Sequence, residues 1–218
     1  METTVAMDSI LATIALTMGA SFCAGINLYA TVFVLGALAR FTNFELPAGL
    51  EVLMSDWVLW PALGMYLIEF VADKIPAVDT AWDSVQTFIR IPAAALIAAN
   101  GLGEVPLEMQ LFAGLLGGSL ATATHTTKAA TRLVAHSTGT SPVVSPVVSV
   151  VEDVAVVGIM AFIVAYPVLS IFLLAMLIIA MFYVMILLWS AVKIVWRKMF
   201  NRSKDAVATT SEPAQVAG

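Results

Sequence analysis

Charged residues are scarce in this chain, and that scarcity decides its class. Only 11% of its 218 residues are Asp, Glu, Lys or Arg, whereas 61% are apolar and the mean hydropathy is +0.96. A soluble domain contains about a quarter charged and about half apolar residues. A soluble core of this length could not hide so much apolar surface, so the composition predicts an integral membrane protein that crosses the lipid bilayer several times.

Cysteine and histidine are also scarce, and several catalytic motifs are missing. Cys23 is the one cysteine, which excludes an intrachain disulfide and a cysteine-based zinc site. The two histidines, His125 and His136, leave few acid–base groups, and the chain has no Walker A loop, GxSxG elbow or HExxH helix. We therefore expect no enzyme, no catalytic residue, no cofactor and no nucleic-acid partner. An enzyme acting on a lipid phosphate stays open as an alternative, although nothing marks its nucleophile.

The first nine residues contain no Lys or Arg. They therefore lack the basic region with which a secretory signal peptide begins. We expect residues 1–9 to form a short N-terminal tail, and we expect the apolar segment that follows them to be retained as a span.

About six apolar segments follow, judged against the roughly 20 residues that cross a bilayer. The first, residues 10–39, is longer than the hydrocarbon core is thick, so it must tilt, bend or extend into water. Its middle, residues 19–27 (GASFCAGIN), is rich in small side chains that permit a bend or close helix packing. The short second and third segments are either full spans or re-entrant. The segments after the first lie at residues 57–72, 84–99, 107–134, 147–165 and 168–196.

These segments predict an all-α fold, a polytopic transmembrane helical bundle of about six spans in one domain, residues 10–198. The polar residues 199–218 predict a disordered cytoplasmic tail. Lys and Arg favour the cytoplasmic side of a membrane. Lys74, Arg132 and the cations between residues 193 and 204 fall on one side, and Arg40 falls on the other. The distribution predicts a multi-pass protein of the cell (inner) membrane with both termini cytoplasmic.

Acidic residues gather in one short run, residues 69–83 (EFVADKIPAVDTAWD), which carries Glu69, Asp73, Asp79 and Asp83 beside Lys74. Either these side chains lie in water at the membrane surface or they face a polar cavity. We interpret Asp79 as a loop residue and Asp83 as a helix cap, because Asp83-Ser-Val-Gln86 fits a capping pattern. Glu69 fits an inward position, and Asp73 is open between a loop acid and an inward one.

Charged residues on four predicted helices fall at a similar depth, roughly 5–10 Å inside the cytoplasmic face at 1.5 Å per residue. Charges within spans usually pair with one another or face water. The pairs that this depth predicts are Glu69 with Arg90, and Lys128 with Glu152 or Asp153. The alternative is structural, because Lys and Arg near helix ends can reach back to the interface and Ser149-Val-Val-Glu152 fits a capping box at a helix start.

The fourth segment carries a cationic stripe. Small residues between positions 114 and 121 are followed on one helix face, at three- and four-residue spacing, by His125, Lys128 and Arg132. This face is suited to bind an anionic group, with His125 as a proton carrier near neutral pH. Alternatively, His125 hydrogen-bonds within the bundle and the two cations reach lipid headgroups. A metal shared by His125 with Glu69 or Asp153 lacks close ligand spacing, so we predict no metal site.

Four motifs together resemble one known family. They are G-x5-G-x-N-L-Y at residues 19–29, the acidic run at 69–83, H-x2-K-x3-R at 125–132, and SPVVSVVED at 145–153. They resemble an uncharacterised, mainly bacterial family of integral membrane proteins, domain of unknown function 4126. The resemblance covers about residues 10–170 and is not expected to reach the last apolar segment and the tail. It implies a membrane location and no particular activity.

The leading hypothesis is a small permease or lipid translocator with a polar cavity open to the cytoplasm, for an anionic solute or lipid headgroup, in which either carboxylates or His125 couple protons. Its alternative is a non-catalytic membrane scaffold or assembly partner. The expected partners are the lipid bilayer and, because a chain of about 23 kDa is small for a pathway, a second copy in a homodimer. The residues expected to line the cavity are Glu69, Arg90, His125, Lys128, Arg132 and Asp153. Those expected to serve as structural polar groups or caps are Asn27, Asp73, Asp83, Ser149 and Glu152.

Overall fold

The computed structural model describes residues 2–210, and these form seven α-helices and one 3-10 helix without a strand. The all-α fold class is therefore confirmed. The helices are α1 (Glu2–Ile26), α2 (Leu28–Phe41), η1 (Ala48–Met54), α3 (Asp56–Ala72), α4 (Pro76–Gly101), α5 (Leu107–Thr138), α6 (Ser141–Ala165) and α7 (Pro167–Thr210).

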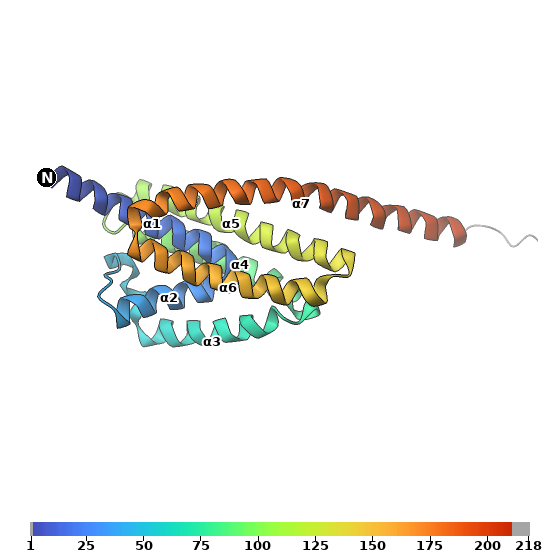
Figure 1. Cartoon of the computed structure of the whole chain (residues 1–218), viewed down its shortest axis with the longest axis horizontal. Helices are drawn as coiled ribbons and strands as arrows, with labels where there is room; N and C mark the ends of the chain where they lie inside the picture. The colour runs from blue at the N-terminus through green and yellow to red at the C-terminus, as the bar shows by residue number, and fades with distance from the viewer. Residues whose placement is uncertain (1, 211–218) are drawn as a thin grey trace, which may run out of the picture.

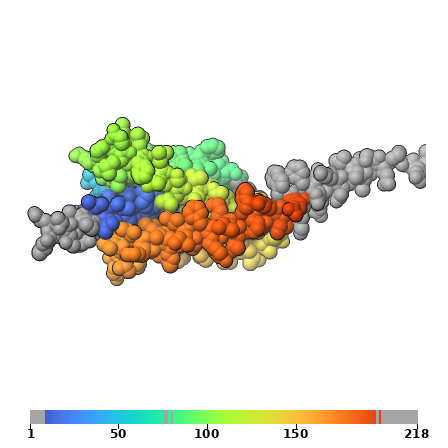
Figure 2. Space-filling model, turned by 90° about the horizontal axis from the view of Figure 1, so that it is seen from above, coloured from blue at the N-terminus to red at the C-terminus, as the bar shows by residue number. Residues whose placement is uncertain are grey.

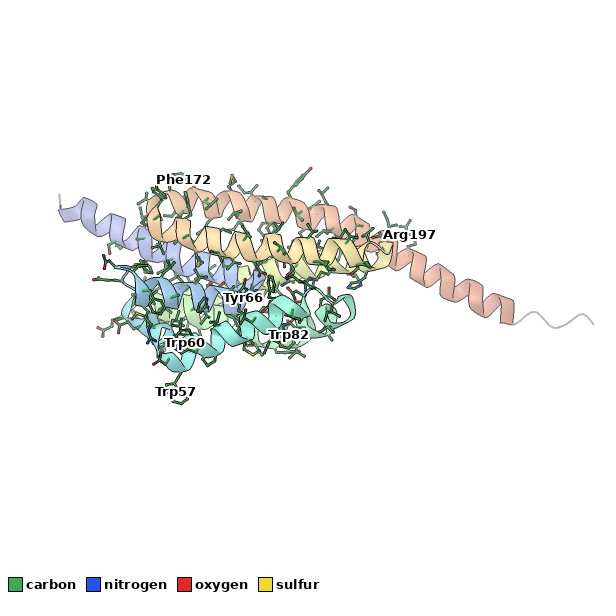
Figure 3. The ribbon with its side chains drawn as sticks, turned by 60° about the horizontal axis from the view of Figure 1, so that its bottom comes forward. Trp57, Trp60, Tyr66, Trp82, Phe172 and Arg197 are labelled. Carbon is green, nitrogen blue, oxygen red and sulfur yellow. The ribbon has the colours of Figure 1, made fainter. Side chains whose placement is uncertain are left out.

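The helices form a bundle of a kind that a membrane can surround (Figure 1). Within the described residues, three helical segments are long and apolar enough to cross a bilayer: Ser9–Ile26, Ser141–Ala165 and Pro167–Ile194. Large apolar side chains also cover the outside of the bundle, and Trp57 (90% exposed) and Phe172 (75% exposed) point away from it (Figure 3). Apolar surface of this extent is what a bilayer covers, so the protein is a membrane protein.

The first apolar segment is broken at Asn27 into α1 and α2. Asn27 has an extended backbone (φ −146°, ψ 102°), and its side-chain oxygen accepts a hydrogen bond from the N–H of Ala30. Asn favours such a helix start because its amide competes with the helical backbone for hydrogen bonds. The sequence predicts that the segment 10–39 tilts, bends or extends into water. In the structure it bends at Asn27 and reverses its direction, because α2 returns towards the end from which α1 came (Figure 1).

Both arms of this hairpin contact the same end of the bundle. Thr17 of α1 packs against Gly101, and Arg40 of α2 donates a hydrogen bond to the carbonyl of Met54. We call this end, which carries residues 42–55 and 102–106, the outer end. The opposite end, which carries residues 73–75 and 139–140, is the inner end. Helices α3 to α7 then run alternately between the two ends (Figure 1).

The hairpin of α1 and α2 determines at which end of the bundle the N-terminal helix begins. The N-terminal helix enters at the outer end, while the last described turns of α7 extend beyond the inner end (Figure 1). The two described ends of the chain therefore lie at opposite ends of the bundle, whereas a single crossing by the first segment would bring them to the same end (Figure 1). The physical reason is that the first segment folds back at Asn27, where we counted it as one crossing.

Close packing of α1 against its neighbours depends on small residues. A Cβ added to Gly25 would overlap the Thr124 hydroxyl of α5, and one added to Gly117 would overlap the Ala98 Cβ of α4. Ser21, which is fully buried, donates a hydrogen bond to the carbonyl of Ala94 on α4 at 3.1 Å. The small residues of segment 19–27 thus serve both roles that the sequence suggested, packing and a bend.

The ends of the described chain are more helical than we expected. Helix α1 already begins at Glu2, within the predicted tail 1–9, and α7 continues to Thr210, within the predicted disordered tail 199–218. No Gly or Pro lies between residues 199 and 210 to end the helix. The rest of that tail, residues 211–218, lies outside the described residues. Figure 2 shows α7 in orange and red along one outer face of the bundle.

Candidate functional site

Charged side chains from α3, α4, α5, α6 and the turn after α3 converge in the inner half of the bundle. Apart from Glu152, whose side chain is 15% exposed, they are at most 6% exposed. Burial of this kind is costly unless the charges pair. We call this group the charge cluster, and its members are Glu69, Asp73, Asp83, Arg90, Lys128, Arg132 and Glu152.

Arg90 forms the deepest ion pair of the cluster. It donates to Glu69 of α3 in a close contact between two fully buried side chains, so the predicted Glu69–Arg90 pair is present. Its second guanidinium nitrogen lies 3.5 Å from an oxygen of Asp83 and 3.2 Å from Nδ1 of His125. Arg90 therefore links α3 and α5 to its own helix α4.

His125 is held in one tautomer by its two neighbours. Arginine can only donate, so Nδ1 of His125 must accept the hydrogen bond from Arg90. Thr87 donates its hydroxyl proton to the carbonyl of Asp83, so it accepts from Nε2–H of His125 at 2.6 Å. This arrangement keeps His125 neutral and hydrogen-bonded within the bundle, which is the alternative to a proton carrier that the sequence left open.

Arg132 joins the turn after α3 to α4. Its guanidinium contacts both oxygens of Asp73, at 2.7 and 3.1 Å, and one oxygen of Asp83 at 2.7 Å. Two-pronged contacts of this kind are the strongest geometry for an arginine–carboxylate pair. Asp73 is therefore an inward acid rather than a loop acid.

Two of the predicted caps are wrong. Helix α4 begins at Pro76, whose fixed φ suits a first helical turn, so Asp83 lies in its second turn and pairs with arginine instead of capping. Helix α6 likewise begins at Ser141, so Ser149 and Glu152 lie inside it and form no capping box. Asp83 and Glu152 can be buried inside a helix because cations of α5 pair with them.

Lys128 contacts the open end of α1. Its ammonium group donates to the carbonyl of Ile26 at 3.1 Å and to Asp73 at 3.1 Å, and it lies 3.3 Å from Glu152. The last carbonyls of a helix carry partial negative charge, so a cation at this end is favourable. The predicted pairing of Lys128 with Glu152 is therefore present, and the break at Asn27 supplies a further ligand.

Asp153, the other candidate partner of Lys128, binds the helix break instead. Asn27 donates its amide to Oδ1 of Asp153 at 2.9 Å while its own oxygen caps α2. Asp153 is 6% exposed, and its Oδ2 has no hydrogen-bond partner among the described residues. Asn27 is thus both a cap and a contact between helices, and the reversal of the chain is fixed by a buried carboxylate on α6.

A row of serines was missed in the sequence. Ser141, Ser145 and Ser149 lie on the buried face of α6, each four residues from the next, and Asp153 continues the row. The signal was visible as the repeat SPVV-SPVV-SVVED, because fourth residues share a helix face. Asp79, interpreted as a loop acid, is also fully buried, and it lies 3.3 Å from Nε2 of His136.

A cavity of about 230 Å³ reaches the cluster between α4 and α5. Arg132 and Asp83 form its charged part, and Ala129 and Leu133 form part of its apolar part. The wall also includes Ser84, Thr87 and His136. Within the described residues, no three His, Cys, Asp or Glu side chains are grouped to hold a metal ion.

The comparisons with known proteins point to a single family. The family model described as "Domain of unknown function (DUF4126)" matches residues 14–187. The chain belongs to this family. The match extends through most of the apolar part of α7, further than the motifs predicted, so that helix is part of the family's common region. No curated protein and no solved structure matches the chain.

Membership in the family does not assign roles to the site residues. The matched region nevertheless contains the whole charge cluster, the break at Asn27 and the serine row of α6.

Proposed function

We propose that the protein is a small permease or lipid translocator, and that the charge cluster and the helix break at Asn27 form its coupling centre. The observation that carries the proposal is that two half-helices end inside the bundle against ionisable side chains. The end of α1 contacts Lys128, and the start of α2 contacts Asp153 through Asn27. Broken helices with charged residues at the break are typical of transporter substrate sites.

The cost of the charge cluster supports a functional role. Apolar side chains of similar volume often stabilise a protein as well as a buried ion pair does, or better. A chain that is 61% apolar nevertheless keeps three cations and four carboxylates of the cluster in one buried region. Ionisable residues at such positions usually mark an ion or substrate pathway.

The ligand that we propose is an anionic solute or lipid headgroup. Arg132 lines the cavity between α4 and α5, and the apolar wall formed by Ala129 and Leu133 suits an acyl chain or an apolar solute part. In the present arrangement Asp73 and Asp83 occupy the guanidinium of Arg132. An incoming anion would have to replace one of them, and this exchange is how the ligand would act on the neighbouring helices.

The proposal also assigns a direction and a location. The inner end, with Lys74 and the cations of α7, would face the cytoplasm of an inner membrane, because Lys and Arg favour that side. The substrate would then reach Arg132 from the cytoplasmic side, without any enzymatic step.

Water access along α5 tests the proposal directly. In a Cys23→Ser background, single cysteines are placed at the buried positions Ala121 and Thr124 and at the cavity-lining Ala129. A membrane-impermeant thiol reagent is then added to the inner side of vesicles. Labelling at all three positions is expected, because a substrate pathway must admit water.

The matched controls are Thr122 and Thr126, which are exposed on the outside of α5, where lipid would cover them. They should stay unlabelled. If Ala121 and Thr124 are as protected as these controls, the bundle is dry in its inner half and the permease proposal fails.

One observation favours a second candidate, a non-catalytic membrane scaffold. All three cations of the cluster are already bound to carboxylates, so the cluster can be understood as a set of structural pairs. A dry α5 together with a stoichiometric partner that copurifies with the protein would support this candidate. A second copy of the chain is one such partner, and light scattering in detergent would detect it.

A further inference from the structure

The serine row of α6 leads from the inner end of the bundle to the helix break. Ser141, Ser145 and Ser149 are 3%, 1% and 1% exposed, and Asp153 follows at 6%. At 1.5 Å per residue the row is about 18 Å long, with about 6 Å between successive members. Further along the same buried face the residues are apolar, namely Val156, Met160 and Ile163. The polar row therefore stops at Asp153.

At the inner end the row begins beside a histidine that solvent can reach. The side chain of His136 is 30% exposed, and its Nε2 lies 3.4 Å from the Ser141 hydroxyl and 3.3 Å from Asp79. The Ser141 and Ser145 hydroxyls are 3.0 Å apart, within hydrogen-bond distance. The first three groups are thus already connected.

At the other end the row meets two buried polar atoms with no hydrogen-bond partner among the described residues. They are the Ser149 hydroxyl and Oδ2 of Asp153. Buried polar atoms are nearly always satisfied by protein or by ordered water. One turn of helix separates the two residues, a spacing that one water molecule can bridge, so both atoms are placed to exchange a proton along the row.

We propose that Asp153 is a proton-binding carboxyl and that His136 and the three serines of α6 form its proton path to the inner end. This inference rests on the proposed transport function and names the coupling ion as a proton. In each transfer the His136 imidazolium loses one proton and the Asp153 carboxylate gains one. Each hydroxyl, and each bridging water between Ser145, Ser149 and Asp153, accepts one proton and releases one, so these groups are unchanged at the end.

The surroundings of Asp153 couple its charge to the rest of the site. It binds Asn27 at the helix break, and the titratable groups close enough to interact with its charge are Tyr66 on α3, Asp73 and Lys74 after α3, and Lys128 on α5, with Glu152 next to it in the chain. A proton on Asp153 removes one negative charge near Lys128 and weakens the acceptor that holds Asn27. Protonation would therefore loosen the point where α1 and α2 meet.

His125 is less suited to this role than Asp153. Its Nδ1 accepts from Arg90, and Thr87 occupies Nε2, so a second proton would have to displace a buried guanidinium. No comparable donor blocks Oδ2 of Asp153. Of the proton-carrying groups that the sequence leaves open, the geometry thus favours the carboxyl of α6 over the histidine of α5.

Infrared spectroscopy of the full-length protein in lipid vesicles tests the path with the proton itself as the probe. The C=O band of protonated carboxylic acids should decrease as the pH rises, and Asp153→Asn should remove one component of that decrease, which we call the Asp153 band. After a rapid pH jump, Ser149→Ala should slow the band change by about tenfold or more, because a missing hydroxyl interrupts proton transfer. Its titration midpoint should stay unchanged, and Ser149→Thr, which keeps the hydroxyl, should restore the rate.

The control is Ser119→Ala, since Ser119 is exposed on α5 and bonds only a carbonyl of its own helix. It should leave both rate and midpoint unchanged. A titrating C=O band that Asp153→Asn leaves undiminished, or an unchanged rate of the Asp153 band in Ser149→Ala, would overturn the inference. Labelling of α5 in the cysteine experiment would then still support a permease, so the two failures are distinguishable.

Discussion

The outer and inner ends of the bundle hold similar ion pairs in opposite surroundings. At the outer end Arg40 lies 2.5 Å from Asp56, with side chains 34% and 63% exposed. In the inner half Arg132 lies 2.7 Å from Asp83, with side chains 3% and 6% exposed. Water can replace the partners of the first pair, whereas the second pair has only the protein. Loss of the ion pair should therefore matter little for stability at the outer end and much in the inner half.

This difference indicates where function is located. Exposed pairs contribute little to stability and are screened by salt. Burying an ion pair requires free energy to remove water from both charges. Apolar side chains of similar volume often hold helices together as well or better. The inner half, with its cluster, its helix break and its serine row, therefore carries the features that packing alone does not explain. The predictions below test the contrast, beginning with the largest expected effect.

Removing a buried cation should give the largest effect. Arg132→Met leaves the carboxylates of Asp73 and Asp83 without their strongest partner. We expect a loss of about 3–5 kcal/mol in the free energy of unfolding, because an uncompensated charge stays buried. Unfolding in detergent micelles, followed by circular dichroism, measures it. Arg40→Met at the outer end is the matched control and should show no measurable change.

A triple variant sharpens this prediction. Arg132→Met combined with Asp73→Asn and Asp83→Asn removes the guanidinium and both carboxylates together. It should recover most of the stability lost in Arg132→Met, since the penalty comes from the unpaired charges. Equal instability of the single and triple variants would show that Arg132 acts by packing instead.

Breaking the contact at Asn27 should have the next effect. Asn27→Ala removes the cap of α2 and the donor to Asp153, and we expect a loss of about 1–3 kcal/mol. Asn27→Asp keeps an oxygen for the cap but sets a carboxylate against Asp153. Its stability should therefore improve at low pH, where one of the two takes a proton, whereas that of Asn27→Ala should not. Parallel pH dependence of the two variants would contradict this account.

The break at Asn27 also shows what the sequence could not predict. Apolar runs predict most of the helices, because the length of such a run must match the thickness of a bilayer. The similar depth and opposite charge of Glu69 and Arg90 were enough to predict their pairing. An Asn inside an apolar run, however, is compatible with a continuous helix. Its partner Asp153 is 126 residues away in the chain, so the reversal is decided by a contact that no local pattern contains.

The misplaced caps have a similar cause. Residues 73–83 and 141–146 lie between the predicted apolar segments, so the sequence predicts them as connections. In the structure most of both runs is helical, and their acidic and serine side chains are buried, namely Asp73, Asp79, Asp83, Ser141 and Ser145. The serine row was predictable in principle, since its four-residue repeat is regular. The role that we propose for it was not, because that proposal depends on His136 and Asn27 lying at its two ends.

Two glycines extend the comparison from charges to packing. Gly25 of α1 faces α5, where an added Cβ would meet the Thr124 side chain and lie 2.7 Å from the Ala121 Cα, whereas an added Cβ at Gly64 of α3 has no neighbour within 4 Å. We expect Gly25→Ala to lower the free energy of unfolding by about 1–3 kcal/mol through overpacking. Gly64→Ala should be neutral or stabilising by up to about 1 kcal/mol, because Ala is the better helix former. Equal effects would mean that α1 and α5 are not in close contact.

The smallest effect is expected at the outer pair. Hydrogen bonds from Arg40 and Trp60, together with the charge of Arg40, lower the pKa of Asp56 below its ordinary value. A lowered pKa in the folded state means that any stabilisation is present above the unfolded pKa, about 4, and is lost as the pH falls through the folded pKa. Asp56→Asn should therefore match the unchanged protein below that window and differ only slightly above it. Thermal unfolding between pH 2 and pH 7 in low and high salt checks this, and a large difference at neutral pH would place the outer pair in the same class as the buried one.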